Sequence, residues 1–109
     1  MGGDMQPQGH VQIVVNLIDF GMNLQEAGDA PRIYWTSVQE PTGGTMTDGG
    51  TLNLESGFPA KTIQQLLQKR HMIGYDLGGY GGYQAIMRAP NDVWVGASES
   101  RKDGMAAGF

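Results

Sequence analysis

The sequence has no cysteine and only two histidines, and these absences exclude several kinds of site. Without cysteine, its 109 residues can form neither a disulfide nor a thiolate zinc site, and they offer no cysteine nucleophile. His10 and His71 are too few for a histidine-rich metal site. We therefore expect this chain to bind no metal and no other cofactor.

Charge is also scarce. Charged residues make up 17% of the chain, the net charge is −4, and only seven residues are Lys or Arg. A nucleic-acid-binding face needs clustered positive charge, and here the basic residues are scattered, so we expect no nucleic-acid partner. No apolar run approaches the roughly 20 residues of a membrane-spanning helix, so we expect no membrane segment in these residues.

Glycine, in contrast, is abundant, with 18 residues and no short-period repeat. The segment Gly78–Gly82 reads GGYGG, which invites comparison with a phosphate-binding loop. Such a loop leads from a strand into a helix, whose N-terminus faces the anion. Here the pattern predicts a strand on both sides, so we interpret GGYGG as a hairpin connection.

Hydrophobic spacing predicts a mixture of helices and strands. A helix is expected over residues 6–20, after an N-cap at Asp4, and a second over residues 58–70. Apolar stripes mark them: Val11, Val14, Val15 and Ile18 in the first, and Ile63, Leu66 and Leu67, expected to be buried, in the second. The stripe of the first helix is wide enough to need cover on more than one face.

Shorter patterns fill the rest of the chain. Asn23 and Glu26 have capping-box spacing and predict a short helix that ends before Pro31. Strands are expected in RIYWTSV, TLNLES, MIGYDL, YQAIMRA and DVWVGAS, with a long turn over residues 40–50. The last two strands should pair as a hairpin around the turn at residues 90–92.

Most polar candidates favour ordinary structural roles. The acidic residues are dispersed, and no pair has a spacing that would bring two carboxylates together. Ser98 and Ser100 lie near Arg101, but a serine nucleophile needs a base within hydrogen-bond reach, and no histidine is near in sequence. Gly2 and Gly3 are different, because two glycines before a helix can aim consecutive N–H groups at one oxyanion. The alternative for this pair is a flexible leader.

Three stretches resemble the small subunit of γ-glutamyltransferases. GGDMQPQGHVQIVVNLIDFGMNLQEAGDAPR matches the family's Gly-Gly entrance to a helix and its following APR motif. ESGFPAKTIQQLLQKRHMI is similar to a later helix, and YGGYQAIMRAPNDVWVGASESRKDGMAAGF is similar to the family's ending. The resemblance covers essentially the whole chain, in the family's order.

This resemblance implies an α+β fold, part of the αββα sandwich of N-terminal-nucleophile hydrolases, with residues 1–109 as a single C-terminal segment. Family members cut themselves to expose a catalytic Thr, which forms an acyl intermediate with a γ-glutamyl substrate such as glutathione. Gly2 and Gly3 fall on the family's oxyanion-hole glycines, and no other catalytic residue carries over. The nucleophilic Thr has no counterpart in this chain, so the fragment alone is expected to be inactive. Its implied partners are the large subunit and the N-terminal half of the small subunit.

Some residues depart from the family pattern. Glu99 stands where Asp is usual, Ser100 where Pro is frequent, and Phe109 where Tyr is usual. The same features suit a related branch of cephalosporin (glutaryl) acylases, and a third interpretation is a stand-alone interaction module without catalytic activity. If the fragment folds alone, we expect its uncovered surfaces to promote self-association.

Overall fold

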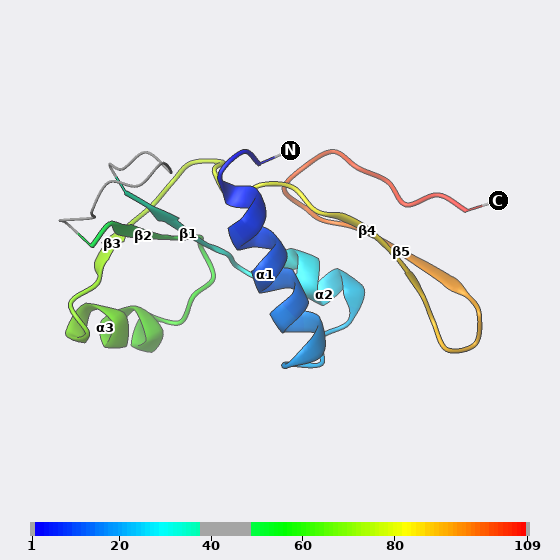
Figure 1. Cartoon of the computed structure of the whole chain (residues 1–109), viewed down its shortest axis with the longest axis horizontal. Helices are drawn as coiled ribbons and strands as arrows, with labels where there is room; N and C mark the ends of the chain where they lie inside the picture. The colour runs from blue at the N-terminus through cyan, green and yellow to red at the C-terminus, as the bar shows by residue number, and fades with distance from the viewer. Residues whose placement is uncertain (1, 38–48, 109) are drawn as a thin grey trace. The chain divides into compact units, whose positions relative to one another are not determined.

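The computed structural model describes residues 2–37 and 49–108. Its elements in chain order are α1 (Met5–Ile18), α2 (Leu24–Asp29), β1 (Ile33–Thr36), β2 (Thr51–Leu54), α3 (Ala60–Gln68), β3 (Met72–Gly74), β4 (Gln84–Arg88) and β5 (Trp94–Ser98) (Figure 1). They form two compact units, one of residues 2–30 with 81–108 and one of Pro31–Tyr80. The expected α+β class is confirmed. Most of the turn expected over residues 40–50 lies outside the described residues.

The two helices of the first unit begin and end close to the predicted residues. α1 starts directly after Asp4, so the predicted N-cap position is confirmed, but Asp4 has αR backbone angles and its side chain makes no capping hydrogen bond. The capping box of α2 is confirmed. The Asn23 side chain accepts from the Glu26 N–H at 2.9 Å, and the Glu26 carboxylate accepts from the Asn23 N–H at 2.9 Å.

β4 and β5 form the predicted antiparallel hairpin, with Gln84 opposite Ser98 and Arg88 opposite Trp94. The turn is closed by the Ala89 N–H, which donates to the Val93 carbonyl at 2.8 Å. α2 contacts both strands. The buried apolar side chains of this unit come from both helices and β5, and they are Met5, Ile13, Leu24, Ala27 and Ala97.

The second unit is a three-stranded sheet of order β1-β2-β3, with β1 and β2 antiparallel and β2 and β3 parallel. α3 connects the two parallel strands and contacts β3. The apolar stripe of α3 was expected to be buried, and this is wrong for the described chain. No residue of α3 is buried, and Leu67 is 53% exposed, because the sheet offers this helix only a small contact surface.

The predicted hairpin around GGYGG is also wrong. β3 pairs with β2, and β4 pairs with β5, so Gly78–Gly82 joins strands of two different sheets. A strand still follows this segment, which agrees with the argument against a phosphate loop. The reason for the error is topological, because local turn signals do not tell which neighbour a strand will choose.

The apolar stripe of α1 is largely uncovered in the described structure. Four of its members or neighbours are 49–75% exposed: Val11, Val14, Ile18 and Phe20. A surface of this kind typically marks an interaction site. No helix in the described part of the chain is both long enough and apolar enough to cross a bilayer.

Candidate active site

The two glycines singled out by the sequence lie at the entrance to α1, and both have positive φ angles. Gly2 has φ +124° and Gly3 has φ +46°, values that glycine adopts without the steric cost of a Cβ. Their carbonyl groups start the helix, since the Met5 N–H donates to the Gly2 carbonyl at 2.8 Å and the Gln6 N–H to the Gly3 carbonyl at 3.0 Å. Gly2 is half-buried and Gly3 is exposed.

The backbone amides of these glycines lie directly before the N-terminus of α1. Within the part of the chain that the structure describes, neither the Gly2 nor the Gly3 N–H donates a hydrogen bond. Both lie where the partial positive charge of a helix N-terminus is concentrated. Met5, only 2% exposed, anchors the first turn of the helix to the core. The entrance to α1 therefore has two backbone N–H groups that are not used within the described residues.

The other candidates from the sequence do not assemble into a catalytic group. His10 and His71 are exposed, and within residues 2–37 and 49–108 no hydrogen bond joins a histidine to Ser98 or Ser100. Within these residues, neither serine therefore has a histidine base. The described residues contain no cluster of three or more His, Asp or Glu side chains that could hold a metal ion.

A cluster of polar contacts that the sequence did not predict lies at the C-terminal end of α2. The Arg101 guanidinium donates to the Gly28 carbonyl at 2.8 Å and to the Ala30 carbonyl at 2.9 Å, and it pairs with the Glu99 carboxylate at 2.8 Å. The Glu99 side chain has no exposed surface and that of Arg101 is 14% exposed. Basic side chains near a helix C-terminus can satisfy its last carbonyl groups. Arg101 thereby fastens the segment after β5 to α2.

Asp29 strengthens the same connection from the surface. Its carboxylate accepts from the Gln25 side chain at 2.8 Å and from the Ser100 N–H at 3.1 Å. These two hydrogen bonds, the Gln25 bond first, lower the pKa of Asp29 below its ordinary value of 3.8. Only the nearness of Arg101 to Ser98 and Ser100 in sequence hinted at this group, because its partners on α2 are about 70 residues away in the chain.

A second buried polar group belongs to the second unit. The Arg32 side chain donates to the Tyr80 carbonyl at 2.8 Å, and the Arg32 N–H donates to the Glu55 carboxylate at 2.9 Å. The Tyr80 hydroxyl accepts from the Asp76 N–H at 3.2 Å. Burial raises the pKa of Tyr80 above its ordinary value of 10.0. These bonds hold the loop after β3 against the beginning of β1, which is a structural role.

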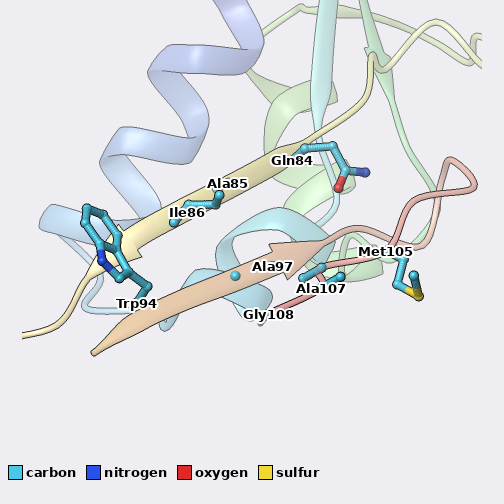
Figure 2. Close-up of a pocket in the computed structure, with 10 residues that line it drawn as sticks. Gln84, Ala85, Ile86, Trp94, Ala97, Met105, Ala107 and Gly108 are labelled. Carbon is cyan, nitrogen blue, oxygen red and sulfur yellow. The ribbon is translucent and has the colours of Figure 1, made fainter. Parts of the chain in front are cut away.

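The first unit has an open groove of about 740 Å³. Figure 2 shows it between the β4–β5 hairpin and residues 105–108, with Trp94 at one end and Met105 at the other. None of its lining side chains carries a charge, and Gln84 supplies the only side-chain amide. The groove therefore offers apolar contact surface and no acid, base or nucleophile.

Comparison with known proteins decides the family. The sequence model described as Gamma-glutamyltranspeptidase matches residues 1–109. The chain belongs to the γ-glutamyltranspeptidase family. The Acylase ACY 1 proenzyme of Pseudomonas sp. (strain V22) is 36% identical over 94 residues, which are 86% of this chain and 15% of that protein. The Glutathione hydrolase-like YwrD proenzyme of Bacillus subtilis (strain 168) is 32% identical over 112 residues, an alignment that covers 99% of this chain and 20% of that protein.

A solved structure supports the same assignment. The cephalosporin acylase from Bacillus halodurans has 41% sequence identity and a TM-score of 0.84, covering 100% of this chain and 19% of that one. As a member of the γ-glutamyltranspeptidase family, the chain has part of an N-terminal-nucleophile hydrolase fold. It spans between 15% and 20% of the length of these three relatives.

Proposed function

We propose that residues 1–109 form the C-terminal segment of an enzyme that transfers or hydrolyses γ-glutamyl groups through an acyl-threonine intermediate. The observation that carries the proposal is the pair of available amides at Gly2 and Gly3, at the start of a helix. Membership of a family of hydrolases and transpeptidases supports the same conclusion. The chain's share of its relatives' length agrees with a role as one part of a larger enzyme.

In this proposal the reaction proceeds by two acyl transfers. The hydroxyl oxygen of the Thr attacks the substrate carbonyl, and its proton passes to the free amine of the same residue. The carbonyl oxygen becomes an oxyanion, which accepts hydrogen bonds from the Gly2 and Gly3 amides. The C–N bond breaks, the amine leaves with the proton, and water or an acceptor amine then takes the acyl group from the Thr.

The Thr and the groups that bind the substrate would come from the rest of the enzyme, which comprises the large subunit and the N-terminal half of the small subunit. We therefore expect the isolated 109 residues to be inactive. Alone, they expose the apolar stripe of α1, and in the described residues each strand of the β4–β5 sheet pairs with only one neighbour, so we expect them to self-associate. In the complete enzyme the same surfaces would be available to the remaining segments.

A glutaryl amide is a second candidate substrate. The identity to the Pseudomonas acylase and to the Bacillus halodurans cephalosporin acylase is 36% and 41%, against 32% for the glutathione hydrolase-like protein. Both substrates present an amide carbonyl to the same two donors. They differ in the α-amino group, which would be recognised by residues outside this chain.

The test uses the complete enzyme and a matched pair of glycine variants. Gly3→Ala and Gly21→Ala both place alanine at a positive φ, +46° and +63°, and in both cases the new Cβ meets no atom within 4 Å. The backbone strain is therefore similar, but only Gly3 lies at the proposed oxyanion site. Alanine keeps the backbone N–H, so the loss of activity comes from displacement of the donor. We expect Gly3→Ala to lower kcat on a γ-glutamyl anilide by about 10²-fold, and Gly21→Ala to change it less than about threefold.

Intact mass spectrometry completes the test, because self-cleavage should release a new N-terminal Thr. Turnover of γ-glutamyl anilide supports the transferase, and turnover of only glutaryl anilide supports the acylase. Equal losses in the two glycine variants would refute the oxyanion role. An enzyme that neither cleaves itself nor turns over either anilide would refute the enzymatic proposal.

A further inference from the structure

The GGYGG segment has no role in the proposed function so far, although one of its glycines lies beside the candidate site. A Cβ added to Gly2 would lie 3.7 Å from the Cα of Gly81 and 3.4 Å from the Gln6 Cγ. Gly2 and Gly81 belong to the same compact unit. The two backbones are thus separated by about the width of one methyl group, although nearly 80 residues lie between them in sequence.

The backbone of Gly81 is suited to this close approach. Its φ is +76°, in the left-handed region where other residues are strained. Gly81 is half-buried, like Gly2, and the next residues lead into Tyr83, whose hydroxyl donates to the Leu24 carbonyl at 3.1 Å. The end of the GGYGG segment is therefore fixed to α2 as it passes the entrance of α1.

We propose that Gly81 is a positioning residue for the oxyanion donors, because its backbone passes so close to Gly2 that a Cβ on Gly2 would be in van der Waals contact with the Gly81 Cα. The inference rests on the proposed function of Gly2 and Gly3. By passing this close, the backbone of Gly81 limits how far the peptide of Gly2 can move. The GGYGG segment then has a role in the acyl-transfer site without binding phosphate.

A substitution at Gly81 should affect the transition state more than substrate binding. The oxyanion forms only as the carbonyl is attacked, so displaced donors lower kcat and leave KM nearly unchanged. A misplacement of about 1 Å can cost about 10²-fold in rate. We expect Gly81→Ala to reduce kcat by about 10- to 100-fold, with KM within about threefold.

The matched control is Gly78→Ala in the same segment. Gly78 has a similar φ of +80°, and a Cβ there meets no atom within 4 Å, so this variant carries the strain without the neighbouring site. Gly81→Asn serves as a second variant if Gly81→Ala folds poorly, since asparagine tolerates positive φ better than alanine. All variants are made in the complete enzyme, and their kinetics are compared at the same number of degrees below each variant's melting temperature.

Two further readouts distinguish positioning from stability. A boronic-acid analogue of the γ-glutamyl substrate, which forms a tetrahedral adduct with a hydroxyl nucleophile, should bind Gly81→Ala more weakly by the same factor as the loss of kcat. The Gly2 and Gly3 amide resonances should shift in Gly81→Ala and stay in place in Gly78→Ala.

Equal kinetics and unshifted glycine amides in the Gly81 variants would overturn the role of Gly81 and leave the proposed function intact. A wild-type enzyme without turnover would overturn both.

Discussion

Arg101 should be one of the most important residues for the stability of the first unit. Arg101→Ala removes three hydrogen bonds from a guanidinium that is 14% exposed, and it takes one partner away from a carboxylate with no exposed surface. Removing one member of a buried ion pair typically costs about 3–5 kcal/mol. Hydrogen bonds to charged groups contribute about 1.5–3 kcal/mol each and are not additive. We therefore expect Arg101→Ala to lower the free energy of unfolding by about 3–5 kcal/mol.

The α2 amides report this loss directly, because their hydrogen exchange measures local opening. The Ala27 and Ala30 N–H groups donate to the Asn23 and Glu26 carbonyls, and they should exchange about 150- to 5,000-fold faster in Arg101→Ala. The control is Arg88→Ala, which breaks an ion pair between side chains that are 61% and 75% exposed. That loss should stay below about 1 kcal/mol.

A second substitution tests the electrostatic part of the argument. In the Arg101→Ala background, Glu99→Gln should recover part of the stability, because a neutral amide is less costly to bury than a carboxylate. The reasoning would be refuted if Arg101→Ala and Arg88→Ala accelerated exchange equally. It would also be refuted if Glu99→Gln made the Arg101→Ala protein less stable still.

Three further predictions concern the same unit. The lowered pKa of Asp29 means that its stabilising effect is present above pH 3.8 and is lost as the pH falls through the lowered pKa. In urea unfolding, the difference in unfolding free energy between wild type and Asp29→Asn should be constant at about pH 5–7 and should decrease toward zero below about pH 4. A difference that stays constant down to about pH 2 would contradict this. Gly28→Ala should lower the melting temperature although alanine favours helices, because its Cβ would overlap the Tyr83 ring; a higher melting temperature would be inconsistent with this packing. Light scattering should give the isolated chain the molar mass of an oligomer, and Ile18→Lys or Phe20→Lys should lower that molar mass. A monomeric wild-type chain would rule this out.

Local signals in the sequence were enough to predict most elements of the fold. The Asn23–Glu26 capping box, the turn at residues 90–92 and the apolar spacing of α1 act over a few residues, and the structure contains all three. The resemblance to the family also predicted the fold class. These features depend on near neighbours or on a pattern that extends over the whole chain.

The errors arose where partners are distant in sequence. GGYGG looks like a hairpin until it is known that β3 pairs with β2 across the α3 crossover. The α3 stripe looks like a core surface, but burial depends on what else is present to cover it. The contacts of Arg101 were not predicted, because its carbonyl partners, on Gly28 and Ala30, belong to a segment far away in the chain.

The central claim is that the Gly2 and Gly3 amides stabilise the oxyanion of an acyl-transfer reaction. The most direct measurement is a crystal structure of the complete enzyme with the boronic-acid analogue bound to its nucleophile. The claim predicts that a boronate oxygen lies about 2.7–3.1 Å from both amide nitrogens. It would be contradicted by an adduct whose oxygens are bound by other groups while the two glycine amides point elsewhere.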